Sequence, residues 1–93
     1  MADSVRKYSV EFKPQALKKV EKLDAPVRRR ITQWITKNLE GCENPRAKGK
    51  ALEDEWEGYR RYRVDNYRLV ANIQDDKIII LIINVDKRND IYR

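Results

Sequence analysis

Apolar and polar residues follow regular periods along most of this chain. Residues 8–12 alternate between the two kinds, which predicts a short half-buried strand. Two segments then show apolar residues at helical spacing, which predicts two helices that each bury one face. Pro14 opens the first helix and Asp24 caps the second, while Gly41 ends it. The apolar positions are Ala16, Leu17, Val20 and Leu23 in the first helix, and Val27, Ile31, Trp34, Ile35 and Leu39 in the second.

The pattern is lost between Gly41 and Gly58, which predicts a long connection held to the core by Leu52 and Trp56. From residue 59 onward the period changes to two, which predicts strands at 59–64, 67–74 and 77–85. The turns between these strands are expected to be two residues long, Asp65-Asn66 and Asp75-Asp76. We therefore expect an α+β fold: an N-terminal strand, an antiparallel helix hairpin, and a mainly antiparallel sheet of about four strands.

The first of these turns fixes a register in which Arg63 lies directly opposite Arg68, with Arg61 on the same face. Like charges opposite each other destabilise a sheet, and a bound phosphate would relieve the repulsion. The alternative is that arginines on an edge strand prevent aggregation and stack on tyrosines. We favour phosphate binding. A two-residue second turn would place Arg68 beside Ile83 on that face, with Arg88 and Tyr92 near the same end of the sheet.

Composition narrows the possible chemistry. The chain has 93 residues, enough for one domain spanning 1–93, and its longest apolar run is six residues, at 78–83. With neither a membrane span nor an evident secretory signal, we expect a cytoplasmic protein. The lone Cys42 excludes an intramolecular disulfide. The chain has no histidine, which excludes serine and cysteine triads that use imidazole. We expect neither a metal ion nor a cofactor.

The positive charge is concentrated in the first half of the chain. Residues 1–50 carry 13 basic and 6 acidic side chains, a net charge of +7, whereas residues 51–93 carry a net charge of −1. This excess favours binding to a polyanion such as nucleic acid, although a solvated helix face is an alternative. An RNA phosphodiester would suit a site without histidine. The 2′-hydroxyl can attack the phosphorus, while arginines stabilise the charge on the nonbridging oxygens.

The chain also resembles a known family. The segments R-x-R-V-x-x-Y-R-L at 61–69 and K-R-x-x-x-Y at 87–92, joined by an Ile-rich strand, are similar to RelE-type toxins of the RelE/ParE superfamily. The resemblance runs from about residue 8 to residue 93. It implies the toxin half of a type II toxin–antitoxin pair, a ribosome-dependent mRNA endonuclease that cuts A-site codons by 2′-hydroxyl attack. It further implies a cognate acidic, RelB-like antitoxin.

The resemblance also assigns roles to residues. The catalytic positions fall on Arg61, Arg63, Arg68, Arg88 and Tyr92. The residues expected to contact ribosomal or messenger RNA are Lys18, Lys19, Arg28, Arg29, Arg30, Lys48, Lys50 and Lys87. The best-known family pattern has lysines where Arg61 and Arg63 stand. Since arginine does not exchange protons, these two are expected to bind phosphate only, and Tyr92 becomes the leading base.

Three apolar residues, Ile79, Leu81 and Ile83, are expected on the arginine face, and an antitoxin helix would cover them. The alternative is that the C-terminal tail folds back over them. Two other functions remain open. One is a ParE-like poison of DNA gyrase, and the other is a non-catalytic homologue that serves as an antitoxin-binding or repressor partner.

Overall fold

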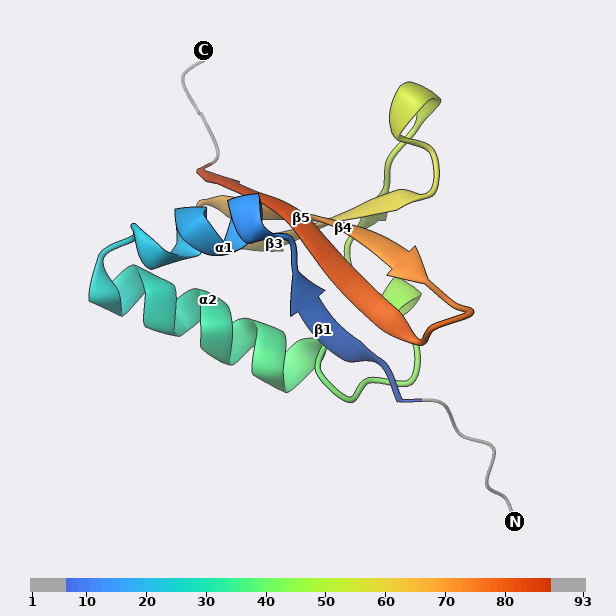
Figure 1. The fold of residues 1–93 in the computed structure, drawn as a ribbon, viewed down its shortest axis with the longest axis horizontal. Helices are drawn as coiled ribbons and strands as arrows, with labels where there is room; N and C mark the ends of the chain where they lie inside the picture. Colours follow the sequence, from blue (N-terminus) through green and yellow to red (C-terminus); the bar gives the residue numbers. More distant parts are fainter. Residues whose placement is uncertain (1–6, 88–93) are drawn as a thin grey trace.

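The structure is a computed structural model that describes residues 7–87 (Figure 1). In chain order its elements are β1 (Ser9–Phe12), α1 (Pro14–Glu21), α2 (Ala25–Asn38), the 3-10 helix η1 (Pro45–Ala47), β2 (Lys50–Ala51), the 3-10 helix η2 (Asp54–Trp56), β3 (Tyr59–Val64), β4 (Tyr67–Gln74) and β5 (Ile79–Lys87). None of the helices in this part of the chain is long and apolar enough to cross a membrane.

The strands form one mixed sheet with the order β1-β5-β4-β3-β2. β1 runs parallel to β5, and the other pairs are antiparallel. The predicted α+β class and element order are confirmed. The sheet has five strands where about four were expected, because the two-residue β2 adds to the edge of β3. So short a strand shows no period in the sequence.

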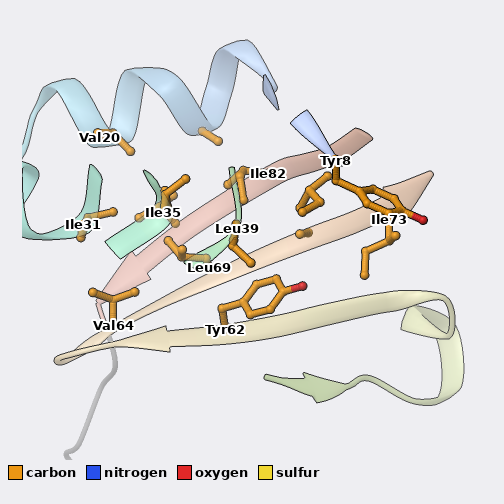
Figure 2. Close-up of a cluster of buried hydrophobic side chains, with 14 residues drawn as sticks. Tyr8, Val20, Ile31, Ile35, Leu39, Tyr62, Val64, Leu69, Ile73 and Ile82 are labelled. Atoms are coloured by element: carbon orange, nitrogen blue, oxygen red, sulfur yellow. The ribbon is translucent and has the colours of Figure 1, made fainter. Parts of the chain in front are cut away.

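Helices α1 and α2 cover one face of the sheet, and the core lies between the two layers (Figures 1 and 2). Ile31, Ile35 and Leu39 of α2 are buried as their spacing predicts. In α1, Ala16 and Val20 are buried, but Leu17 is 43% exposed, so its assignment to the core is wrong. Leu17 follows Ala16 and therefore points about 100° away around the helix, beyond the narrow strip that α1 buries.

The connection between β4 and β5 differs from the prediction. Gln74 pairs with Ile79, so residues 75–78 form the loop in place of a two-residue turn. The Asp75 carboxylate accepts hydrogen bonds from the Arg46 guanidinium and the Tyr8 hydroxyl, which anchors the loop to distant parts of the chain. A bulge between Val70 and Ala71 shifts the register again. As a result Arg68 lies opposite Asp86, so the prediction that Ile83 is its cross-strand neighbour is wrong.

The long connection between α2 and β3 does not pack on the core throughout its length. Leu52 is half-buried, but Trp56 is 48% exposed, so the prediction that Trp56 holds this segment to the core is wrong. The η2 turn stands away from the body of the domain, yellow-green in Figure 1. All residues from 53 to 58 are exposed, which leaves the Trp56 ring at the surface of the sheet's outer face.

Candidate functional site

Two pairs of like charges lie side by side on the outer face of the sheet. Arg63 pairs with Arg68 across β3 and β4, as the Asp65-Asn66 turn predicts. Their neighbours Tyr62 and Leu69 are completely buried on the core face, so the arginines point away from the helices. Lys50 of β2 pairs with Arg61 in the same way. The sequence did not predict this second pair because β2 could not be recognised.

We call Lys50, Arg61, Arg63 and Arg68 the cationic strip. None of the four has an acidic partner within ion-pair distance among residues 7–87, where the ion pairs are Lys19–Asp86, Arg30–Asp65 and Arg46–Asp75. Facing charges of one sign destabilise a sheet by about 0.2–1 kcal/mol per pair. The strip keeps this repulsion unrelieved, which leaves its charge available for an anion.

The strip borders two depressions in the surface. The larger, which we call the main cleft, has a volume of about 330 Å³. It is lined by Leu52, Trp56, Arg61, Arg68, Val70, Ile83, Asn84 and Asp86. A smaller cleft of about 240 Å³ is lined by Gly49, Lys50, Arg61 and Arg63. Because Arg61 lines both, the clefts adjoin, and two anionic groups of one polymer could be held along the strip.

Asp86 brings a carboxylate into the main cleft, directly opposite Arg68. The Lys19 ammonium lies 3.0 Å from Asp86 Oδ1 and donates to Asn84 Oδ1 at 2.7 Å, and the Asn84 amide donates to Asp86 Oδ2. β1 ends before this part of β5, so α1 lies along the strand instead, and Gln15 donates to the Ile83 carbonyl. The Asp86 charge is therefore largely offset by Lys19, and sequence reasoning missed this acid.

The backbone beneath the strip is held by a close contact at Gly49. This glycine has a φ of +79°, and a Cβ there would lie 2.5 Å from the Arg61 carbonyl oxygen and 2.8 Å from the Tyr62 ring. Arg60 donates hydrogen bonds to the carbonyls of Arg46, Lys48 and Gly49. Arg60 thus supports the loop beneath the strip, while its neighbour Arg61 faces the clefts.

A buried hydroxyl fixes the same loop from below. Tyr62 donates a hydrogen bond to the Pro45 carbonyl, and burial raises the pKa of Tyr62 to about 12, so it remains a donor at neutral pH. The bond to Asp75 likewise raises the pKa of Arg46. Burial raises the pKa of the Cys42 thiol, which makes it a poor nucleophile.

The remaining predicted residues lie in several places. Lys18, Arg29, Lys48 and Lys87 are exposed, as predicted for RNA contacts. Lys19 is bound to Asn84 and Asp86, Arg30 pairs with Asp65, and Arg28 donates to the Leu23 carbonyl. Ile79, Leu81 and Ile83 are half-buried on β5. Arg88 and Tyr92 lie outside the described residues, so their part in the site stays a prediction.

A metal site has no evident basis in the described part of the chain. Among residues 7–87, no group of three or more His, Cys, Asp or Glu side chains lies together as possible ligands. Asp86 is the one acidic residue that lines the main cleft, and its oxygens are already bound by Lys19 and Asn84. The expectation of chemistry without a metal remains a prediction.

Comparison with known proteins identifies the family to which this chain is similar. Residues 10–92 match the model of the ParE toxin of type II toxin–antitoxin systems. The chain is 33% identical to the mRNA interferase toxin RelE of Escherichia coli over 82 residues, covering 87% of this chain and 83% of that protein. The toxin in a RelBE toxin–antitoxin complex from Mycobacterium tuberculosis superposes with a TM-score of 0.81 at 28% identity, covering 96% of this chain and 100% of that one.

The isolated RelE toxin of E. coli superposes with a TM-score of 0.74 at 26% identity, covering 91% of this chain and 88% of that one. The match to the family model, at residues 10–92, includes both helices, the strands of the sheet and the hairpin that carries the arginines. The chain therefore belongs to the RelE-type toxins of the RelE/ParE superfamily, the toxin components of type II toxin–antitoxin systems.

Proposed function

We propose that this toxin is a ribosome-dependent endoribonuclease that cuts mRNA in the A site and so stops translation. The observation that carries the proposal is the cationic strip, in which the side chains of Arg61, Arg63 and Arg68 share one face without acidic partners among residues 7–87. Support comes from a relative named as an mRNA interferase.

The proposed chemistry follows from what arginine can and cannot do. The 2′-hydroxyl oxygen attacks the adjacent phosphorus, the bond to the 5′-oxygen breaks, and a 2′,3′-cyclic phosphate is left. Arg61 and Arg68 stabilise the charge on the nonbridging oxygens, a contribution typically worth about 10²–10³-fold in rate per donor. Arginine does not take up the hydroxyl proton. We assign that step to Tyr92 in its phenolate form, the departing 5′-oxygen takes a proton from water, and Arg88 serves as a further phosphate ligand.

Docking on the ribosome is assigned to the exposed basic residues. Lys18 and Arg29 lie on the helix layer, Lys48 precedes β2, and Lys50 and Lys87 belong to β2 and β5. Together they would follow the backbone of ribosomal and messenger RNA, with an attraction that weakens as salt is added. We also propose a cytoplasmic location, where translating ribosomes lie.

The proposed partner is an acidic, RelB-like antitoxin. Ile79, Leu81 and Ile83 offer half-buried apolar surface on β5, beside the strip. An amphipathic segment could cover them while its carboxylates pair with the free guanidinium groups. Complexes of relatives are described as RelBE toxin–antitoxin assemblies, which supports this partner.

The test is cleavage on translating ribosomes. Purified protein should cut mRNA at A-site codons, detected by primer extension, and Arg68→Ala should lower the cleavage rate by about 10²–10³-fold. Lys77→Ala, which removes an exposed charge from the β4–β5 loop, is the matched control and should cut normally. The proposal fails if the wild type produces no cut while Arg68→Ala and Arg88→Ala still arrest growth.

A second candidate is poisoning of DNA gyrase, favoured by the ParE description of the matching family model. Under this function the strip would bind a protein target instead of RNA. Inhibition of gyrase supercoiling by the purified toxin, with mRNA intact on ribosomes, would establish it in place of the ribonuclease.

A further inference from the structure

Trp56 is an exposed tryptophan inside the main cleft. It is 48% exposed, and apart from Leu17 it is the only large apolar side chain among residues 7–87 that is exposed in this way. Leu17 lies on α1, away from any cleft described above, whereas Trp56 lines the same cleft as Arg61 and Arg68. An aromatic ring left in water beside free guanidinium groups needs an explanation other than core packing.

The ring is held in place by its hairpin. The Leu52 amide donates to the Tyr59 carbonyl at 3.0 Å, which closes the base of the connection, and the Trp56 amide donates to the Glu53 carbonyl at 3.1 Å. The Trp56 and Tyr59 rings meet edge to face, with centroids 5.5 Å apart and an angle of 85°. An edge-to-face pair fixes the indole ring while covering less of it than a parallel stack.

Charge divides the cleft into two ends. Arg61 and Arg68 form a cationic end, where the Asp86 carboxylate opposite Arg68 is already bound by Lys19 and Asn84. The segment around Trp56 instead carries four exposed acids, Glu53, Asp54, Glu55 and Glu57. These carboxylates repel a phosphate from the tryptophan end and favour it at the arginine end. The rest of the lining comes from the apolar residues Leu52, Val70 and Ile83 and from Asn84.

A ligand that suits this cleft has an anionic group at one end and a flat, uncharged ring at the other, as a nucleotide does. The volume of about 330 Å³ is at the lower end of the range of small-molecule sites. Tryptophan stacks on the face of any base, which is how single-stranded nucleic acid is held without sequence readout.

We propose that Trp56 is the stacking platform for one nucleobase of single-stranded mRNA, whose adjoining phosphate is bound by Arg61 and Arg68. The inference rests on the proposed function, because it names a contact of the same substrate at the same site. In this proposal Trp56 holds the base, while Arg61 and Arg68 hold the phosphate. The acidic η2 turn then orients the strand so that a base, and not a phosphate, meets the indole.

Intrinsic fluorescence gives a direct test. In a Trp34→Phe variant of the full chain, Trp56 is the only tryptophan. A trinucleotide with 2′-O-methyl groups, which cannot be cleaved by this route, should quench its emission. A trinucleotide of equal charge that lacks bases should not. Equal quenching by both, or none at millimolar concentration, would overturn the proposal.

If Trp34→Phe folds poorly, affinity measurements on Trp56 variants test the same proposal. Trp56→Ala should bind a labelled 2′-O-methyl trinucleotide about ten- to hundredfold more weakly than the wild type, and Trp56→Phe should lose less. Leu17→Ala, which truncates the other exposed apolar side chain, should bind normally. Unchanged affinity of Trp56→Ala would contradict the proposal.

Two further outcomes separate the possible errors. If Trp56→Ala binds RNA normally but loses affinity for the antitoxin, Trp56 is a protein contact and the inference is wrong. If the wild type leaves ribosomal mRNA intact, the proposed function fails. Base-dependent quenching would still establish the stacking site in that case, so the two failures are distinguishable.

Discussion

At the scale of single residues, the cationic strip holds like charges opposite each other, which lowers the stability of the sheet. Arg63 and Arg68 lie directly opposite each other, and neither forms an ion pair among residues 7–87, since the Asp86 carboxylate opposite Arg68 on β5 is bound by Lys19 and Asn84. A sheet selected for stability alone would have an opposite charge at one of these positions. Under the proposed function a bound phosphate relieves this repulsion, which adds to the free energy of binding.

Replacing Arg63 by glutamine should therefore make the protein more stable and less active. The free energy of unfolding in urea should rise by about 0.2–1 kcal/mol, because a facing like charge is gone. Cleavage on ribosomes should fall about tenfold or more, because a charge-assisted phosphate contact is lost. Arg29→Gln removes the same charge from α2, where it has no facing arginine, and should leave stability unchanged. A less stable Arg63→Gln variant would show that the pair is not repulsive.

Tyr62 gives a second prediction at this scale, on the dependence of stability on pH. Folding raises its pKa to about 12 from an ordinary value of about 10. The stability that the neutral hydroxyl contributes is thus fully present below pH 10 and is lost as the pH rises through 12. Tyr62→Phe should lower the free energy of unfolding by about 1–3 kcal/mol at neutral pH, because the Pro45 carbonyl loses its donor.

The difference in unfolding free energy between the wild type and Tyr62→Phe should narrow between pH 10 and pH 12, as measured by urea unfolding at each pH. Val64→Ala is the control, because it truncates a buried residue of the same strand that does not titrate. Its gap from the wild type should stay constant over that range. A Tyr62→Phe gap that persists unchanged beyond pH 12 would rule out this role for the hydroxyl.

At the scale of elements, the short strand β2 depends on Gly49. The residue needs both a positive φ and the absence of a Cβ, because the Arg61 carbonyl oxygen would lie 2.5 Å away from one. Gly41 also has a φ of +79°, but a Cβ there would meet nothing within 4 Å. Comparing substitutions at the two glycines therefore separates the cost of backbone strain from the cost of a steric clash.

Gly41→Ala should lose about 1–3 kcal/mol of unfolding free energy, the usual penalty of a positive φ. Gly49→Ala should lose more, and it should also impair cleavage, because β2 must move away from β3 and carries Lys50 with it. Denaturation and ribosome cleavage of both variants check this. Equal losses in the two variants would mean that the close approach at Gly49 is not retained in solution.

The elements that the sequence predicts well are those with local causes. The Asp65-Asn66 turn is set by its own residues, so the Arg63–Arg68 register follows from it, and α2 follows from a regular apolar stripe. The four-residue β4–β5 loop depends on Arg46 and Tyr8, which reach Asp75 from far along the chain. For that reason the Arg68–Asp86 pairing, and with it the acidic side of the cleft, could not be predicted.

Exposure of single residues was also beyond the sequence pattern. A large apolar residue such as Trp56 is expected in the core, but η2 projects from the sheet and leaves it exposed. Leu17 lies past the edge of the face that α1 buries, because it is turned about 100° around the helix from the buried Ala16. The arginines of the strip and Ile83 on the same face were predictable, whereas the place of Trp56 in their cleft was not.

At the scale of the whole molecule, positive charge is divided between two regions, to which the proposed function assigns docking and catalysis. The excess of +7 lies in residues 1–50, mainly on the helix layer, while the strip lies on the opposite face of the sheet. Lys18 and Arg29 are exposed without an ion-pair partner among the described residues. Docking and catalysis should therefore respond to different substitutions.

Lys18→Gln combined with Arg29→Gln should raise KM for ribosomes severalfold and reduce the salt dependence of binding, with kcat unchanged. Arg68→Ala should instead lower kcat. Single-turnover cleavage at increasing ribosome and salt concentrations separates the two effects. Lys77→Gln is the control for loss of one positive charge elsewhere. A fall in kcat for the docking variant would show that the helix layer takes part in the chemical step.

The parallel pairing of β1 with β5 has a consequence for how the protein is made. Ser9 finds its partner only at Ile79, so the first strand of the nascent chain waits for the last one to leave the exit tunnel. Pairing over so long a separation is slow compared with local hairpin closure. The sheet that carries the arginines is thus completed only after nearly the whole described chain has emerged. Under the proposed function, that delay would give the antitoxin time to bind the toxin before it is active, and would keep it from cutting mRNA on the ribosome that makes it.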